Sequence, residues 1–174
     1  DTEGVAVIDT GPGSSLLEFL KGREVDTVNV VLLSHADEDH IGGLLQLLAS
    51  REFRVGRVRL NTDALKRSAI WDDLLYELDI LHGADAVEFE PSLVRNNTGE
   101  FDLGEVHIEI LGPSRYLAGK GPGSTDSAGR RVTTNSVSAT IRLTIREQPL
   151  AVLMGDMDEV GLDDLSDAGV NSTA

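Results

Sequence analysis

Four potential metal ligands lie close together in one short run of this sequence. They are His35, Asp37, Asp39 and His40. The run follows the apolar stretch 28–33, which is typical of a buried strand, and precedes a helix predicted over about 43–50. Imidazole and carboxylate groups suit zinc, manganese or iron ions. The spacing H-x-D-x-D-H therefore predicts a divalent metal site just after a strand.

A further carboxylate, Asp156, follows a second apolar strand. Side chains that leave the ends of two such strands can meet at one edge of a sheet. His35 and Asp37 are two residues apart, so in an extended segment they would point to the same side and could hold one ion. Asp39 and His40 could hold a second ion, with Asp156 as the bridge. Two ions would lower the pKa of a water held between them.

Two other interpretations of this run compete with a hydrolytic metal site. A calcium-binding EF-hand loop would begin at Asp37, but Ile41 and Leu48 occupy its fifth and twelfth positions, which need oxygen ligands. A solvated polar loop without metal is the second, because polar loops after strands are common. Four ligand side chains at this spacing, with Asp156 after its own strand, favour the metal site over both.

Strands alternate with helices in the first half of the chain. The predicted strands cover 5–8, 28–33 and 55–60, and the predicted helices cover 16–20, 43–50 and 64–82. Asp63 is expected to cap the last helix, and Gly83 is expected to end it. This alternation predicts a sheet with covering helices.

The second half of the chain contains mainly strands, several of which show an alternating apolar pattern. They are predicted over 87–89, 101–103, 106–111, 137–145 and 150–154, and an acidic helix is predicted near 158–168. A stretch rich in glycine, proline, serine and threonine, 112–134, is expected to form a long loop. No linker interrupts the pattern, so residues 1–174 are predicted to form a single domain.

The composition excludes several kinds of chemistry. The 174 residues include 30 acidic and 15 basic side chains, which gives a net charge of −15. Such a surface repels nucleic acid unless metal ions or a local group of arginines attract it; Arg130 and Arg131 in the long loop could meet a phosphate. The absence of cysteine excludes disulfides, thiolate zinc sites and thiol catalysis. No apolar run approaches the ~18 residues of a membrane span, so no membrane segment is predicted in this chain.

Three segments together resemble the metallo-β-lactamase superfamily. They are Ile8-Asp9-Thr10-Gly11, the run from Ser34 to Gly43, and Leu153-Met154-Gly155-Asp156. The usual central pattern of that family is H-x-H-x-D-H, and here Asp37 replaces the second histidine. This variant is similar to the branch that contains the metallo-β-lactamase-like domain of the DNA-uptake protein ComEC, and the segment 134–138 resembles the asparagine-rich segment of that branch.

The resemblance implies an α/β (α+β) fold, an αββα sandwich, with one or two divalent ions, zinc or manganese, and hydrolysis of a phosphodiester. On the family pattern His35 and Asp37 would hold the first ion, and Asp39 and His40 the second. Asp39 would also orient the attacking water and Asp156 would bridge the ions, which makes these two the expected catalytic residues.

The resemblance also assigns two supporting residues. Asn135 would lie near the first ion, and Asp9 would support the motif loop through hydrogen bonds. The family has one more histidine beyond the Gly-Asp segment and a first strand hairpin before the Asp-Thr-Gly segment. This chain shows neither, so it is expected to be truncated at both ends and to be a fragment of a longer protein.

The resulting hypothesis is a metal-dependent phosphodiesterase or nuclease that acts on DNA within a larger uptake or defence protein. One alternative is hydrolysis of a small ester, lactone or thioester at the same site. The other is a binding or scaffold module that keeps the fold without catalysis. The compartment would be extracytoplasmic for part of an uptake channel and cytoplasmic otherwise.

Overall fold

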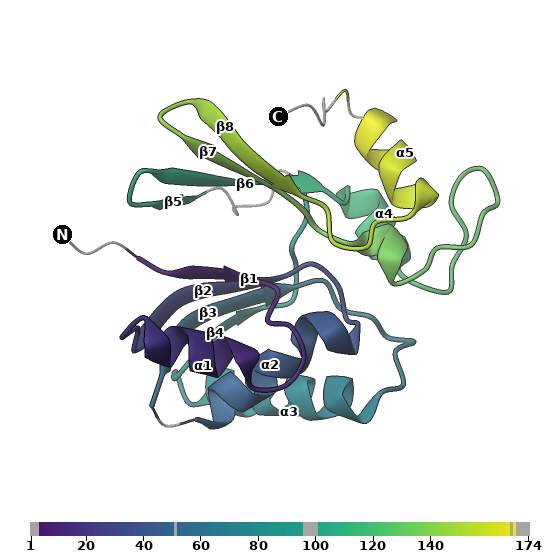
Figure 1. Cartoon of the computed structure of the whole chain (residues 1–174). Helices are drawn as coiled ribbons and strands as arrows, with labels where there is room; N and C mark the ends of the chain where they lie inside the picture. The colour runs from purple at the N-terminus through teal and green to yellow at the C-terminus, as the bar shows by residue number, and fades with distance from the viewer. Residues whose placement is uncertain (1–3, 51, 96–100, 168, 170–174) are drawn as a thin grey trace.

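Two four-stranded sheets pack face to face in the computed structural model, which describes residues 4–50, 52–95, 101–167 and 169 (Figure 1). The strands of the first sheet are all parallel and lie in sequence order. They are β1 (Ala6–Ile8), β2 (Thr27–Leu33), β3 (Arg54–Leu60) and β4 (Glu88–Glu90). Because the strands are parallel, their carboxyl ends share one edge of the sheet, where polar groups can gather.

Three helices cover the outer face of the first sheet (Figure 1). They are α1 (Ser15–Gly22), α2 (Glu38–Ala49) and α3 (Ala69–Gly83). Alternate β2 residues Val31 and Leu33 face the helices and pack in one apolar cluster with Leu44, Trp71 and Leu74. Burial of this surface stabilises the fold by about 25 cal/mol per Å² of apolar area.

The second sheet is antiparallel, with its strands also in sequence order. They are β5 (Phe101–Leu103), β6 (Val106–Gly112), β7 (Thr140–Ile145) and β8 (Gln148–Leu153). The short helices α4 (Arg115–Lys120) and η1 (Asn135–Val137) lie with α5 (Glu159–Asp167) at one end of this sheet. The predicted αββα sandwich is confirmed.

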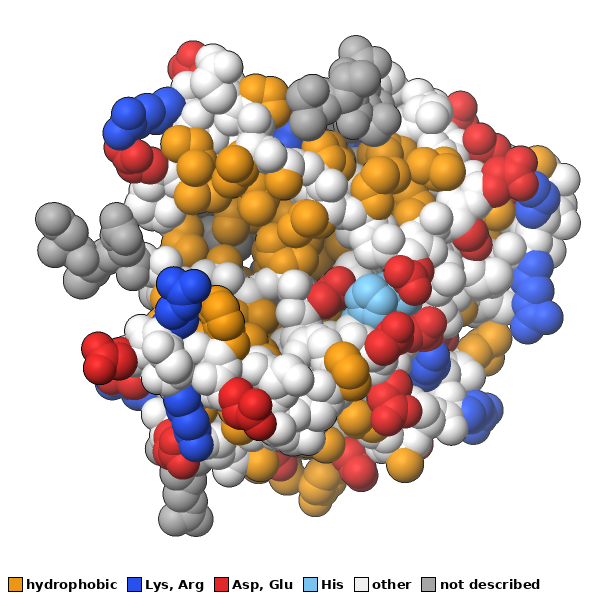
Figure 2. Space-filling view, viewed as in Figure 1, with side chains coloured by type: hydrophobic (Ala, Val, Ile, Leu, Met, Phe, Trp, Pro, Cys, Tyr) orange, Lys and Arg blue, Asp and Glu red, His pale blue; other side chains and the backbone are white. Residues whose placement is uncertain are grey.

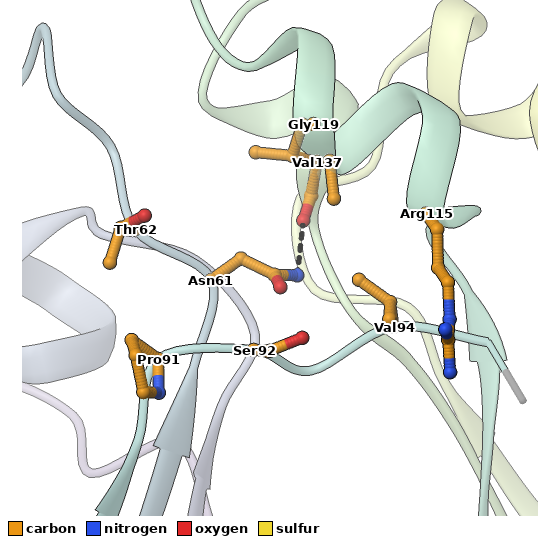
Figure 3. A pocket seen from close by; sticks show the side chains of 9 residues that line it. Asn61, Thr62, Pro91, Ser92, Val94, Arg115, Gly119 and Val137 are labelled. Carbon is orange, nitrogen blue, oxygen red and sulfur yellow. Dashed lines mark hydrogen bonds between the residues drawn. The ribbon is translucent and has the colours of Figure 1, made fainter. Parts of the chain in front are cut away.

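The two sheets meet through their inner faces. Val30 and Leu32 of β2 pack against Ile108, Ile110 and Ile141 of the second sheet. At the end of β3 the buried Asn61 also joins the two halves, because its Nδ2 donates to the carbonyl oxygens of Leu93 (2.8 Å) and Val137 (3.3 Å). Asn61 borders a cavity of about 330 Å³ that α4 also lines (Figure 3). The Asn61 side-chain amide thus fixes η1 against the first sheet.

Helices α3 and α4 begin where the sequence pattern did not place them. The expected helix start at 64 is wrong, because Asp63 instead closes a turn by accepting the backbone N–H groups of Leu65 and Lys66, and α3 begins only at Ala69. The stretch expected to be a loop contains α4, whose first turn is capped by the Ser114 hydroxyl oxygen, which accepts from the backbone N–H of Leu117.

Two strands also differ from the prediction. The strand predicted from residue 137 begins at Thr140, because η1 precedes it. The strand predicted as buried, β8, lies at the edge of its sheet with Leu150 and Leu153 exposed.

An apolar cleft lies between β1 and the second sheet, on the face shown in Figure 2. No helix among the described residues has the length and apolar character to span a bilayer.

Two cross-strand ion pairs join β3 to β4 in very different surroundings. The Arg59 side chain is 0% exposed, and its Nε lies 2.7 Å from Oε2 of Glu90. The neighbouring pair, Arg57 with Glu88, has a similar separation of 2.8 Å but is partly exposed at both ends. Removing the partner of a buried charge costs far more than breaking an exposed pair.

We therefore expect Glu90→Ala to lower the free energy of unfolding by about 3 kcal/mol or more, since it leaves the Arg59 charge buried without its partner. The matched variant Glu88→Ala should cost less than about 1 kcal/mol. Urea denaturation followed by circular dichroism measures both changes. Equal losses of stability in the two variants would show that burial does not set the cost of removing the carboxylate.

Candidate metal centre

The candidate ligands come together at the carboxyl edge of the first sheet, where the second sheet meets it. Asp9 follows β1, His35 follows β2, and Asp156 lies in the turn after β8. On the molecular surface, a histidine lies among several acidic side chains at this place (Figure 2). Two sheets therefore contribute to one site.

Helix α2 begins earlier than predicted and carries two of the four residues of the H-x-D-x-D-H motif, Asp39 and His40. Asp37 is its N-cap, with extended backbone angles, so Asp39 and His40 lie in the first helical turn rather than in a loop. The Asp37 carboxylate makes no capping hydrogen bond with the helix. An aspartate at this position commonly caps, and here its carboxylate is directed to the site instead.

Three side chains form the tightest group of possible ligands. One ligand atom from each of His35, His40 and Asp156 lies within 4.8 Å of the others. The His40 Nε2 is 3.7 Å from Oδ1 of Asp156, and the two imidazole centroids are 4.0 Å apart. The His35 side chain is completely buried, yet its Nε2 has no hydrogen-bond partner in the described part of the chain. A buried nitrogen without a partner is costly, so these residues fit a bound cation.

Hydrogen bonds behind the two imidazoles define which nitrogen faces the site. Ser34 Oγ donates to Oδ2 of Asp9 (2.8 Å), so its only proton is used. The His35 Nδ1, 2.9 Å from Ser34 Oγ, must then be the donor in that contact. His40 Nδ1 lies 2.8 Å from Oδ2 of Asp9 and donates to it. Both imidazoles therefore present an Nε2 lone pair to the site, as metal ligands do.

The other two aspartates of the motif lie at the margin of this group. Asp37 Oδ2 is 3.5 Å from Nε2 of His35, while its Oδ1 accepts a hydrogen bond from Nζ of Lys66. Asp39 Oδ2 is 3.9 Å from Nε2 of His40, and its side chain is 69% exposed. Sequence reasoning missed Lys66, which falls in the first turn of the helix predicted over 64–82; no local signal relates this lysine to Asp37, which is 29 residues away.

Asn135 is the first residue of η1, and among the described residues its side chain makes no hydrogen bond to the ligand group. Its segment is held by Asp158, whose Oδ2 accepts from the hydroxyls of Ser136 (2.7 Å) and Thr133 (2.8 Å). Burial opposes ionisation of Asp158, but these hydrogen bonds outweigh it and keep its pKa below the usual value. The proposed role of Asn135 stays a prediction.

The two histidines of the site have pKa values that are shifted in opposite directions. Burial lowers the pKa of His35, and the nearby His40 lowers it further. Burial also acts to lower the pKa of His40, but the hydrogen bond and charge of Asp9 outweigh it and the pKa is raised. Burial acts to raise the pKa of Asp37, but Lys66 outweighs it and the pKa is lowered. A neutral His35 beside ionised carboxylates suits a divalent cation.

The turn that carries Asp156 approaches the motif closely enough to require glycine. Gly155 has a φ of +56°, and a Cβ placed on it would lie 2.8 Å from Ser34 Oγ. The oxygen it would strike is the one that orients His35 and touches Asp9. The close approach of this glycine therefore brings the Asp156 carboxylate to the histidines.

We expect Gly155→Ala to weaken metal binding and to lower stability, since the new methyl group displaces Ser34 or the turn. Gly129→Ala is the matched control, because Gly129 also has a positive φ of +82° but no atom within 4 Å of an added Cβ. Both variants incur backbone strain of about 1–2 kcal/mol, and Gly155→Ala should cost about 1–3 kcal/mol more. Calorimetric metal titration and thermal melts test this, and equal behaviour of the two would contradict it.

We further expect Asp9→Asn to lower the pKa of His40 in metal-free protein, because a neutral amide no longer favours the imidazolium ion. Asp102→Asn is the control, since Asp102 Oδ1 lies 2.9 Å from Nδ1 of the partly exposed His107, away from the site. Imidazole resonances followed by NMR during a pH titration report the change. An unchanged His40 pKa in Asp9→Asn would disprove the assigned hydrogen bond.

Comparison with known proteins identifies similar sequences and folds. Residues 1–130 match the family model described as the metallo-beta-lactamase superfamily. The Zn²⁺-bound PqqB from Methylobacterium extorquens superposes with a TM-score of 0.51 at 12% identity, over 86% of this chain and 48% of PqqB. No curated protein sequence matches the chain.

A second solved structure, an HARLDQ-motif mutant of a metallo-beta-lactamase from Cronobacter sakazakii, has a TM-score of 0.46 at 14% identity. The match covers 96% of this chain and 64% of that protein. The chain thus spans about half the length of PqqB and just under two thirds of the Cronobacter protein.

Proposed function

This chain belongs to the metallo-beta-lactamase superfamily, which indicates a metal-dependent hydrolase, and we propose that its substrate is a phosphodiester bond of DNA. The observation that carries the hydrolase assignment is the buried Nε2 of His35, which has no hydrogen-bond partner among the described residues and lies beside His40 and Asp156. The phosphodiester assignment is supported by Asp37 in place of the second motif histidine, a variant similar to the ComEC branch. A role in DNA uptake, beside further domains of a longer protein, is part of this proposal.

Each residue of the site then has a defined task. His35, His40 and Asp156 would hold a divalent ion, zinc or manganese, and the marginal Asp37 and Asp39 would complete its surroundings or hold a second. When bound, the ion supplies a Lewis acid and lowers the pKa of water. The exposed Asp39 carboxylate is free to orient the attacking water and to take up its proton.

Lys66 and Asp9 act through other residues. The Lys66 ammonium, in the loop that follows β3, donates a hydrogen bond to Asp37 and holds it near the site. Asp9 holds Ser34 and His40, so that both imidazole Nε2 atoms stay directed inward. Loss of such a hydrogen bond to a ligand commonly costs about 10- to 100-fold in metal affinity or activity.

The first test is metal content followed by cleavage. The wild-type chain, purified and given excess manganese or zinc, should retain metal and cleave single-stranded DNA only with metal present. Asp156→Asn should lose metal affinity and cleavage by more than the roughly 100-fold expected for a lost supporting hydrogen bond. Asp73→Asn, which removes the same charge from an exposed position on α3, should behave as the wild type.

Other outcomes would replace the proposal. Metal-dependent hydrolysis of a nitrophenyl ester or a lactone, with no cleavage of DNA, would favour the small-ester hydrolase. Retained metal with no hydrolysis of either substrate would favour a binding module. A folded protein that takes up neither metal would contradict the metal centre itself.

A further inference from the structure

A groove of about 630 Å³ lies next to the metal centre, between two loops that are far apart in the sequence. One wall is the loop that follows β3, with Lys66, Arg67 and Ser68, and the other is the long loop before η1, with Arg131. Ligand sites in proteins commonly have volumes of about 300–1,000 Å³. The groove is therefore large enough to hold part of a substrate.

The groove has positive charge in a protein whose net charge is −15. Arg67 and Arg131 are exposed, and among the described residues neither makes an ion pair. The adjacent Arg130 differs, because it is bound to Asp126 (2.8 Å) and Asp163 (2.7 Å). Only one of the two consecutive arginines is thus available to a ligand.

The one carboxylate among the described residues that line the groove does not cancel this charge at its surface. Asp63 is 3% exposed, and its oxygens accept the backbone N–H groups of Leu65 and Lys66 and the hydroxyl of Thr134. The lining thus offers two guanidinium groups that make no ion pair with any described residue.

Lys66 connects the groove to the metal centre. This lysine lines the groove, and its Nζ donates to Asp37, whose other oxygen lies 3.5 Å from Nε2 of His35. A chain-like substrate with its reactive group at the histidines could therefore extend past Lys66 toward Arg67 and Arg131.

We propose that this groove binds a phosphate of single-stranded DNA adjacent to the phosphodiester at the metal centre, with Arg67 and Arg131 as its ligands. The inference rests on the proposed function, whose substrate it specifies as a polymer held by more than its scissile bond. Guanidinium groups match phosphate through paired, charge-assisted hydrogen bonds. Positively charged grooves that follow the backbone are a general means of binding single strands.

The test measures binding without hydrolysis. A fluorescein-labelled thymidine oligonucleotide is titrated with protein kept metal-free by chelator, and its anisotropy is followed at several salt concentrations. Arg67→Gln and Arg131→Gln should each weaken binding about tenfold, as expected for a lost charge-assisted contact. Each should also reduce the slope of log affinity against log salt by about 0.7.

Arg23→Gln is the matched control, because Arg23 is an exposed arginine at the far end of α1 and its loss changes the net charge equally. It should leave binding unchanged. Equal weakening in Arg23→Gln, or no weakening in Arg67→Gln and Arg131→Gln, would overturn the groove assignment. Circular dichroism spectra of all three variants establish that the fold is retained.

The two proposals fail in different ways. Arginine-dependent binding of the oligonucleotide without cleavage after metal is added would support the groove and refute the nuclease. Metal-dependent cleavage of DNA whose binding is insensitive to both arginines would support the nuclease and refute the groove.

Discussion

The Asp9 carboxylate is the group on which the rest of the site depends. The backbone of Asp9 has a φ of +54°, an uncommon conformation for a residue other than glycine. In this position Oδ1 accepts the backbone N–H of Ser34 (2.7 Å), and Oδ2 faces Ser34 Oγ and His40 Nδ1. One carboxylate thereby holds the end of β2 and the start of α2, and through Ser34 it also orients His35. The strained turn is stabilised by the contacts it makes.

The site also depends on how the two sheets are joined. The carbonyl oxygen of Ser34 accepts the backbone N–H of Ala139 (2.8 Å), just before β7, and Gly155 packs against the Ser34 hydroxyl. Asn61 adds a second link, from the end of β3 to η1. His35 follows β2 of the first sheet, His40 lies on α2, and Asp156 follows β8 of the second sheet, so a change in sheet packing would separate the ligands. Stability and metal binding should therefore be coupled in this protein.

Charge is distributed unevenly over the molecule. Acidic groups surround the candidate metal centre, where a divalent ion would compensate them. Beside them, Lys66, Arg67 and Arg131 border a groove in which the only carboxylate among the described lining residues is buried and already hydrogen-bonded. A net charge of −15 therefore does not exclude an anionic substrate, because local groups decide which charge a ligand meets at short range.

The sequence alone determined the type of site and the class of fold. The ligand residue types and their spacing after apolar strands predicted a metal centre, and the alternation of elements predicted a sheet covered by helices, since these are local properties of the chain. The αββα sandwich was implied by the resemblance of three sequence segments to the metallo-β-lactamase superfamily. Only the tertiary structure decided that Asp37 meets Lys66 and that Arg131 rather than Arg130 borders the groove. These features follow from contacts between segments far apart in the sequence, and no periodicity or local spacing encodes such contacts.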